Sequence, residues 1–466
     1  MKQRCIIFTF VFGVLVASLS GGTPENGLTP SQIDMLMASV KLDPSTRAAM
    51  NAVSNNDIRD LALNREIAAV KDEVFSFKLP TKGITDQQES GRCWIFAGLN
   101  LMRQEVIKKF ELEEFELSQS YLSFWDKLEK ANVFLEFIIE TRDRDLLDRE
   151  VQHMLEGPID DGGYWGYVAG IVEKYGIIPK SFMGETHSSS ETHRMNYILE
   201  TALHRDALQL RTLAATGKTV ADLRQEKINM LKGVFRILVI NYGMPPTEFL
   251  WRTVDDSGRA SIPVTCTPQQ FYKEVVGVDL SQYVSLCNYP IHPMDKHYSI
   301  KLTRGMADRS DISFVNLSSD ELKSYALKAL LDSQRVWFGC DMGHNVHGKK
   351  GIMAKNLYNY EELFGVDLGM TKAERLDYRH SSSNHAMVFV GVDLVDGKPR
   401  KWLVENSWGD ERGDNGLFTM TDDWFDEYVL DVIIPKKYLP ERILAIYEEP
   451  SIPLPVWDPA WQSLRW

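Results

Sequence analysis

A cysteine at position 93 stands at the start of a stretch whose apolar residues recur at the spacing of a helix. The residues on this face are Ile95, Leu99, Met102 and Val106. The unpaired N–H groups and the positive dipole end of a helix N-terminus stabilise a thiolate, which is the nucleophilic form of cysteine. A small buried hydrophobe is the alternative for such a residue. The stretch therefore predicts a helix that begins at Cys93 and presents its sulfur as a nucleophile.

Such a nucleophile needs an imidazole, a group that orients the imidazole, and donors for an oxyanion. "SSNHAMVFVGV" places His385 at the start of an apolar strand, and "KWLVENSW" places Asn406 at the end of the next one. Adjacent antiparallel strands bring two such side chains together. Gln87, six residues before Cys93, offers a side-chain N–H to an oxyanion. Trp408 is expected to cover the His385–Asn406 pair and to exclude water from it.

Helical signals precede strand signals along the chain. Pro and Gln follow Thr29 and Thr267 at the spacing of a helix N-cap with a capping box. Residues 191–242 are strongly helical, and residues 247–264 are typical of a hairpin. The chain becomes β-rich after Val336. This order indicates an α+β fold rather than alternating α/β units.

The two ends of the chain are expected to lie outside the packed fold. Lys2 and Arg4 precede a short apolar run and a small, polar exit, which predicts a secretory signal over residues 1–20, with a short membrane anchor as the alternative. No later run reaches 18 apolar residues, so no membrane span is expected after signal removal. The final 20 residues contain four prolines and are expected to be extended.

Charge and cysteine spacing exclude several classes of function. The formal net charge is −13, and it becomes more negative when the signal is removed, so nucleic acid and anionic membranes are not expected partners. Neither the cysteines nor the pair His344 and His347 has the spacing and third ligand of a metal site. We therefore expect no metal and no cofactor. The sequence alone does not decide whether Cys266 and Cys287 form a disulfide.

Several motifs resemble the bleomycin hydrolase and aminopeptidase C branch of the papain-like cysteine peptidases. They include "SGRCWIFAGLNLMR", "DGGYWGYVAGIVEKYGIIPKS", "SSSNHAMVF", "ENSWGDERGDNG" and "VWDP", and the likeness runs from about residue 28 to the end. The resemblance implies that Cys93 is the nucleophile, His385 the general acid/base, Asn406 its orienting group and Gln87 the oxyanion donor. It implies a papain-like fold with a helical half and an antiparallel β half.

The same resemblance implies how substrates bind. Gly162 and Gly163 would form a wall that a peptide backbone approaches closely, with Trp408 and Trp466 as further substrate-binding residues. In the resembling enzymes the C-terminal carboxylate meets the N-terminal ammonium of a short peptide, which makes them aminopeptidases. Here the tail after "WDP" is longer than usual and bulky. The branch also assembles as a homohexamer whose active sites face an enclosed cavity.

The spacing of the motifs fits this organisation, because His385 follows Cys93 by roughly 290 residues where papain-type enzymes have about 130–150. A large insertion must lie between them. The expected segments are a signal peptide (1–20), an N-terminal arm (21–75), a papain-like helical half (76–184), a helical and hairpin insertion (185–335), a papain-like β half (336–445) and an extended C-terminal tail in or near the active site (446–466).

The sequence thus predicts an exported cysteine aminopeptidase, periplasmic or secreted, that acts on peptides through a thiolate and an acyl-enzyme. A papain-like endopeptidase and a non-catalytic hexameric binding scaffold are the alternatives for function. A cytoplasmic or membrane-anchored protein is the alternative for location.

Overall fold

The computed structural model describes residues 26–70 and 72–460. It divides into two compact units, one up to Ala62 and one from Leu63. The described part of the first unit is helical, with α1 (Pro30–Ser39), α2 (Pro44–Asn55) and α3 (Ile58–Ala62). The capping box predicted at Thr29 is confirmed, because its hydroxyl accepts from the N–H of Gln32 and the Gln32 side chain accepts from the N–H of Thr29.

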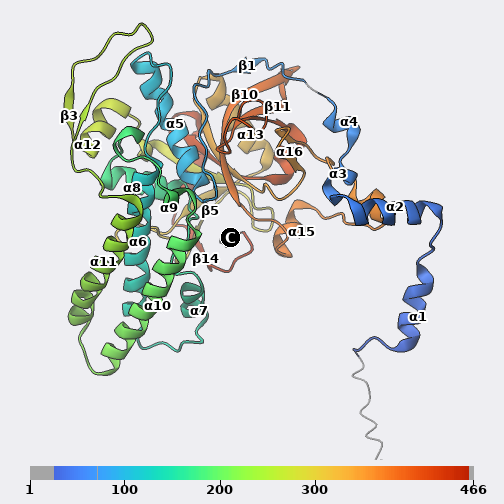
Figure 1. Cartoon of the computed structure of the whole chain (residues 1–466), viewed down its shortest axis with the longest axis horizontal. Coiled ribbons are helices and arrows are strands. Elements are labelled where there is room, and N and C mark those ends of the chain that lie inside the picture. Colours follow the sequence, from blue (N-terminus) through green and yellow to red (C-terminus); the bar gives the residue numbers. More distant parts are fainter. Residues whose placement is uncertain (1–25, 71, 461–466) are drawn as a thin grey trace, which may run out of the picture. The chain divides into compact units, whose positions relative to one another are not determined.

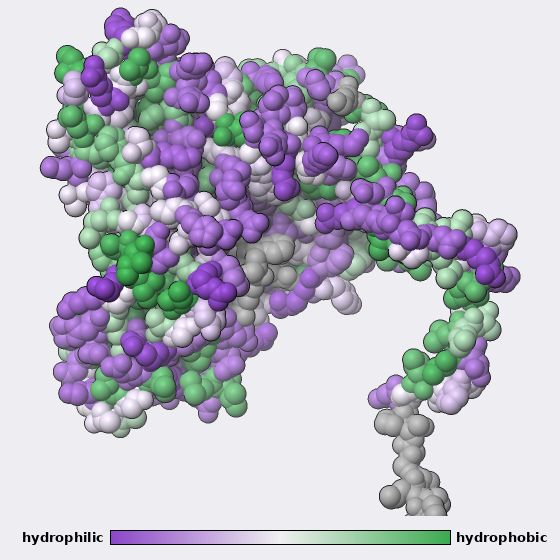
Figure 2. All heavy atoms as spheres, in the orientation of Figure 1, coloured by the Kyte–Doolittle hydropathy of each residue, from purple (hydrophilic) through white to green (hydrophobic). Residues whose placement is uncertain are grey.

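The first two helices leave their apolar side chains uncovered. Neither α1 nor α2 has a buried residue. Figure 2 shows green, apolar atoms along this arm, where the exposed side chains of α1 are Ile33, Met35, Leu36 and Met37. An apolar helix face of this kind normally packs against another surface.

The second unit begins with a helical half built around two buried helices. α5 (Cys93–Lys109) starts at the predicted residue, and α6 (Gln119–Glu140) is capped by the Ser118 hydroxyl. The long helices α6, α10 and α11 pack against one another (Figure 1). The other helices before the hairpin are α4 (Arg65–Ala68), α7 (Arg149–Glu156), α8 (Trp165–Tyr175), α9 (His187–Ser190), α10 (His193–Ala215) and α11 (Val220–Tyr242).

The helical block predicted over residues 191–242 consists of two helices rather than one. Gly217, with a φ of 86°, and the capping box of Thr219 separate α10 from α11, and Gly243 ends α11 as predicted. The predicted hairpin is confirmed, with β2 (Phe249–Trp251) paired to β3 (Val264–Cys266). The Thr267 capping box is also confirmed, although its helix α12 (Pro268–Gln270) continues as a π-helix.

A mixed twelve-stranded sheet forms the other half. Its order is β14-β5-β6-β4-β13-β7-β10-β11-β12-β9-β8, and β1 pairs with β10. The strands are β1 (Phe77–Lys78), β4 (Tyr283–Cys287), β5 (Lys296–Ile300), β6 (Ser313–Asn316), β7 (Val336–Cys340), β8 (Val346–His347), β9 (Ile352–Met353), β10 (His385–Val395), β11 (Lys398–Glu405), β12 (Leu417–Thr421), β13 (Val429–Pro435) and β14 (Ile452–Leu454). The helices among them are α13 (Ser319–Leu331), α14 (Tyr360–Phe364), α15 (Lys372–Asp377), α16 (Asp422–Tyr428) and α17 (Glu441–Glu448).

Both faces of this sheet are buried. Along β10, Ala386 and Val388 pack into the apolar cluster that contains α5, whereas Met387 and Phe389 pack into a second cluster on the opposite face. The predicted α+β class is therefore confirmed, although the sheet is mixed rather than wholly antiparallel. The fold brings the start of α5 against β10.

The structure shows no bond between Cys266 and Cys287, which are free thiols, as are the other two cysteines among the described residues. The extended tail begins a little later than predicted, because α17 continues to Glu448 before β14 adds in parallel to β5. None of the helices in the described ranges has the length and apolar run needed to cross a bilayer.

Candidate active site

The sulfur of Cys93 lies at the junction of the helical half and the sheet. Cys93 is the first residue of α5 and is 5% exposed. The backbone N–H of Ala386 acts on its sulfur as a hydrogen-bond donor, as do the N–H groups of Trp94 and Cys93 itself. Because Ala386 follows His385 directly, the thiol and the imidazole come from adjoining positions across this junction.

Burial dominates the titration of both groups. It raises the pKa of the Cys93 thiol to about 11, even though the three N–H groups lower it as the helix start predicts. It lowers the pKa of His385 to about 4, against the effect of the hydrogen bond to Asn406. At the sulfur, burial and the helix start therefore act in opposite directions, and for each group taken alone burial favours the neutral form.

The position of Asn406 fixes the tautomer of His385. The predicted antiparallel pairing of β10 with β11 is confirmed, and Nε2 of His385 lies 2.8 Å from Oδ1 of Asn406. The same Oδ1 accepts the backbone N–H of Ser407 at 2.8 Å, and a backbone N–H only donates. The atom facing His385 is therefore the amide oxygen, so Nε2 carries the hydrogen. Nδ1 keeps its lone pair and is available as a base.

Trp408 covers this pair as predicted. Its ring lies 4.9 Å from the ring of His385, and its far side packs edge-on against Phe418. His385 itself is only 7% exposed. The histidine thus contacts an uncharged amide and an aromatic ring, which together limit the access of water.

Gln87 is held next to the site by the segment that follows Asn406. Its backbone N–H donates to the carbonyl of Ser407 at 2.8 Å, and the Ser407 hydroxyl donates to Oε1 of Gln87 at 2.7 Å. Its Nε2 donates to the carbonyl of Ser90 at 2.6 Å. This uses one of the two N–H bonds of the amide, and the second is available to a substrate oxygen. Ser407 was missed by sequence reasoning, although it stands inside the quoted "ENSW" motif.

The glycine pair has a packing role that the sequence did not reveal. A Cβ on Gly163 would lie 2.3 Å from the Trp94 ring, so this glycine is needed for the tryptophan to pack. The carbonyl of Gly162 accepts from Lys130 at 2.5 Å. The absence of a side chain at Gly163 therefore serves the core next to Cys93, in addition to any contact with substrate.

Buried charges below this wall were also missed. Lys127 of α6 ion-pairs with Asp161 at 2.7 Å, and Lys130 pairs with both Asp126 and Asp160 at 3.0 Å. A signal was present, because Lys127 lies three residues after Phe124 and four before Ala131 on the apolar face of α6. A lysine at such a position requires a buried partner.

The described part of the tail lies next to the glycine pair, because Val456 lines the same pocket as Gly162 and Gly163. The ring of Trp457 lies 4.1 Å from the guanidinium of Arg149, its carbonyl accepts from Arg379 at 2.7 Å, and Asp458 lies 2.9 Å from Nε2 of His292. Ala460 is buried in a cluster against which Tyr164 packs, one residue after the glycine pair. Trp466 lies outside the described residues.

The histidine pair considered for a metal makes other contacts. Nε2 of His344 lies 2.9 Å from the carbonyl of His380, and its ring stacks on Tyr428. Within residues 26–70 and 72–460, no group of three or more His, Cys, Asp or Glu side chains is arranged so that it could hold a metal ion.

Comparisons with known proteins agree with this geometry. The family model described as the peptidase C1-like family matches residues 27–460. Aminopeptidase C of Lactobacillus helveticus is 40% identical over 421 residues, which cover 89% of this chain and 94% of that protein. Bleomycin hydrolase of Mus musculus is 38% identical over 445 residues, which cover 93% and 98%. The crystal structure of PepW from Lactobacillus rhamnosis HN001 matches with a TM-score of 0.90 at 40% identity, covering 93% of this chain and 99% of that one.

Proposed function

The chain belongs to the peptidase C1-like family, and we propose that Cys93, His385, Asn406 and Gln87 are the residues that carry out its reaction. The protein is a cysteine aminopeptidase of the bleomycin hydrolase type, in line with relatives that are similar over nearly the whole chain. The observation that carries the assignment of residues is the shared Oδ1 of Asn406, which leaves Nδ1 of His385 as the base.

The reaction starts at the thiol of Cys93 and the imidazole of His385. As a peptide enters, the Cys93 proton passes to Nδ1 of His385 and the sulfur attacks the carbonyl carbon of the first residue. The imidazolium then gives this proton to the departing amine as the C–N bond breaks, which leaves a thioester. Water, deprotonated by the same imidazole, attacks the thioester and releases the amino acid and the thiol. The free N–H of Gln87 and the N–H of Cys93 stabilise each oxyanion.

We propose that the tail, residues 446–466, limits cleavage to the N-terminal residue. The contacts of Trp457 and Asp458 and the burial of Ala460 beside Tyr164 support a tail that runs along the cleft from the side of the glycine wall. The carboxylate of Trp466 would then meet the substrate ammonium, and Trp466, Trp408, Gly162 and Gly163 would bind the substrate.

We also propose that the protein is a homohexamer with its active sites in a shared cavity. The uncovered apolar side chains of α1 support this assembly, because a second copy would bury them. Light scattering after size exclusion tests the proposal, and a single species near the chain mass of 53.2 kDa would contradict it.

We propose further that residues 1–20 direct export to the periplasm or the outside of the cell and are then removed. The basic start and short apolar run support this proposal. Mass spectrometry of both ends of the mature protein tests it, since an intact N-terminus on material recovered from the cytoplasm would contradict export. The same measurement reports whether the tail is trimmed.

Fluorogenic amides test the activity. Unblocked aminoacyl amides should be cleaved by the wild type and not by Cys93→Ala. Cleavage confined to N-blocked substrates would favour an endopeptidase, and a function unchanged in Cys93→Ala would favour a scaffold. Removing residues 461–466 should shift cleavage towards internal bonds, whereas an unchanged product pattern would contradict the role of the tail.

A further inference from the structure

A buried ion pair lies directly below the wall that faces the nucleophile. The side chain of Lys127 is fully buried in the middle of α6, and that of Asp161 is 11% exposed. Their charged atoms are 2.7 Å apart, and Nζ of Lys127 also donates to the carbonyl of Asp160. A buried cation of this kind is stable only while its partner is in place.

The carboxylate of Asp161 links three separate segments. Its Oδ2 accepts the N–H of Gly91 at 3.0 Å and the hydroxyl of Thr192, and its Oδ1 accepts from Asn196 at 2.8 Å. Its backbone carbonyl accepts from the indole of Trp94 at 2.7 Å. One residue therefore ties the substrate wall to the turn before Cys93 and to α10.

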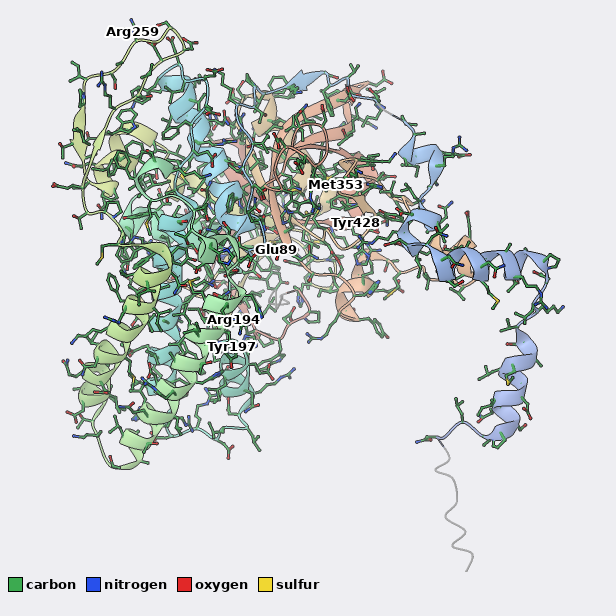
Figure 3. All side chains as sticks on the ribbon, viewed as in Figure 1. Glu89, Arg194, Tyr197, Arg259, Met353 and Tyr428 are labelled. Carbon is green, nitrogen blue, oxygen red and sulfur yellow. The ribbon has the colours of Figure 1, made fainter. Side chains whose placement is uncertain are left out.

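The same approach explains the glycine before the nucleophile. A Cβ on Gly91 would lie 2.8 Å from the Cβ of Asp161, so only a glycine allows this contact. Figure 3 locates the region through Glu89, whose segment bridges to Glu191 just before α10, and through Arg194 and Tyr197 on the first turns of that helix.

The pair lies among several other titratable groups. Burial acts to raise the pKa of Asp161, but Lys127 together with the hydrogen bonds from Thr192 and Asn196 outweighs it and holds that pKa well below its ordinary value. Asp161 in turn acts to raise the pKa of Cys93. Other titratable groups that face the pair or the thiol are Asp126, Lys130, Asp160, Tyr164, Tyr167, Tyr242, Arg92, Glu185, Asp431, Cys340 and His385.

The geometry points to Lys127 and Asp161 as a positioning pair for the peptidase reaction: Asp161 fixes the Gly91 turn and the glycine wall on either side of the thiol, and Lys127 neutralises the carboxylate that does so. This inference rests on the proposed role of Cys93 as the nucleophile. Neither side chain touches the reacting atoms, so their effect passes through backbone position and charge.

Lys127→Met separates charge from position, because it keeps the apolar stem and leaves Asp161 without a counter-charge. Because Asp161 already acts to raise the pKa of Cys93, an unpaired carboxylate there should move the pH midpoint of Cys93 alkylation by iodoacetamide upward by about one unit. The double variant Lys127→Met/Asp161→Asn removes both charges and should return the midpoint to within a few tenths of the wild type. Lys127→Arg keeps the charge and should leave it unchanged.

The role of Asp161 in positioning the Gly91 turn and the glycine wall is tested by measuring kcat. Asp161→Asn, and the double variant with its normal midpoint, should still lose about 10-fold in kcat, since one acceptor of the Gly91 and Thr192 hydrogen bonds is gone. Lys227→Met is the matched control. Lys227 of α11 pairs at 2.6 Å with Glu136, which lies on α6 as Lys127 does but about 13 Å further along that helix. This variant should change neither the midpoint nor kcat.

Wild-type midpoints and kcat in folded Lys127→Met and in the double variant would overturn the inference. If Lys127→Met does not fold, Asn196→Ala decides: it removes one hydrogen bond to Asp161 and no charge, and a wild-type kcat and KM would overturn the positioning role. Alkylation needs no substrate, so a failure of the aminopeptidase assignment leaves this readout intact and is recognised separately by unreacted amides.

Discussion

The two walls of the cleft hold their functional groups in opposite ways. On the helical wall, the segments around Gly91 and Gly162 are held by ion pairs, namely Asp161 with buried Lys127 and partly exposed Asp160 with Lys130. On the sheet wall, the ring of His385 is held by two uncharged groups, the amide of Asn406 and the ring of Trp408. The helical wall is thus positioned by charge and the sheet wall by hydrogen-bond direction and packing.

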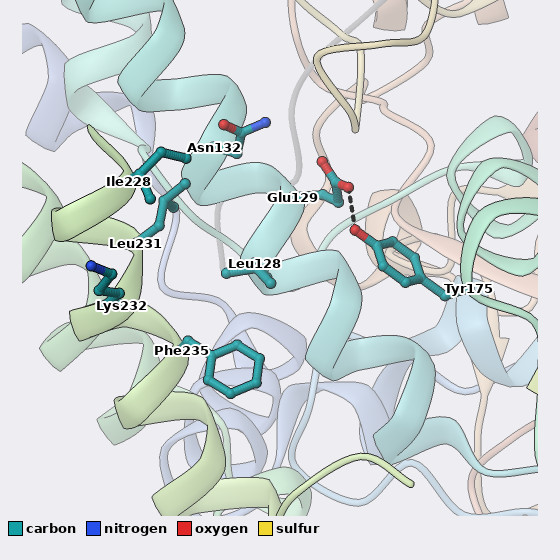
Figure 4. A pocket seen from close by; sticks show the side chains of 8 residues that line it. All are labelled: Leu128, Glu129, Asn132, Tyr175, Ile228, Leu231, Lys232 and Phe235. Carbon is teal, nitrogen blue, oxygen red and sulfur yellow. Dashed lines mark hydrogen bonds between the residues drawn. The ribbon is translucent and has the colours of Figure 1, made fainter. Parts of the chain in front are cut away.

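Because of this difference, the two walls should respond differently to substitutions. α6 also carries Glu129, which points towards Tyr175 and accepts a hydrogen bond from its hydroxyl (Figure 4). Its ion-pair partner Lys174 is 34% exposed, whereas Lys127, the cation next to the glycine wall, is fully buried. A lost ion there leaves an uncompensated charge, whereas a lost neutral group on the sheet wall leaves the electrostatics nearly unchanged and disturbs the tautomer.

The largest effect should come from the sheet wall itself. His385→Ala removes the acid/base group, and kcat/KM for an unblocked aminoacyl amide should fall by about 10⁴-fold. Since the side chain contacts only neutral groups, the melting temperature should change by no more than a few degrees. His380→Ala, five residues upstream in an exposed loop, is the control and should retain activity within about twofold. A comparable loss in that control would point to the loop rather than to the imidazole.

Asp431 tests the contrast between the walls, because it is a buried acid on the sheet wall, where the other groups described are uncharged. Asp431 of β13 is buried beside Gly339 and accepts a hydrogen bond from the hydroxyl of Ser383 at 3.2 Å, and burial raises its pKa to about 7. The folded pKa lies above the ordinary value of 3.8, so its contribution to stability is present below about pH 4 and is lost as pH rises through 7. Asp431→Asn should therefore stabilise the protein at pH 8, by on the order of 4 kcal/mol, and hardly at all at pH 4.

Urea unfolding at the two pH values measures this difference. Asp393→Asn is the matched control on β10: burial opposes ionisation there too, but Arg400 outweighs it and lowers the pKa of Asp393. That variant should be destabilised at pH 8, with the opposite sign. An Asp431→Asn protein no more stable than the wild type at pH 8 would mean that this wall holds a charged carboxylate after all.

Sequence patterns predicted the sheet wall better than the helical wall. His385 begins β10, and Asn406 and Trp408 follow directly after the end of the neighbouring strand β11, so the pairing of these two strands brings them together. The partners of Asp161 come from α6, α10 and the turn before Cys93, far apart in sequence, and no local period joins them. The direction in which the pKa of Cys93 shifts was also beyond the sequence, because burial, which only the fold determines, outweighs the effect of the helix start.

Gln87 lies where the walls meet, and its loss should be the next largest effect. Gln87→Ala removes an oxyanion donor, so kcat should fall by about 10²-fold or more while KM changes little. Gln87→Glu keeps the shape and the oxygen that Ser407 contacts but not the donor, and should lose as much. Full kcat in Gln87→Glu would show that the side chain acts through Ser407 rather than on the oxyanion. Stopped-flow hydrolysis of a single amide series provides both constants.

The smallest effect tests the claim that the sheet wall works without charge. Asn406→Ala removes the acceptor that selects the tautomer of His385, and the loss of one buried hydrogen bond of about 1.5–3 kcal/mol corresponds to roughly 10- to 150-fold in kcat. Asn406→Asp keeps an oxygen for the Nε2 hydrogen and for the N–H of Ser407 but adds a negative charge. An adjacent anion favours the imidazolium, so the pKa of His385, followed by its ring proton resonances, should rise from about 4. If it does not rise, a counter-ion already acts on this histidine and the contrast between the walls fails. If the pKa of His385 rises and the pH midpoint of Cys93 alkylation also falls, the uncharged amide of Asn406 is the group that limits formation of the thiolate–imidazolium pair.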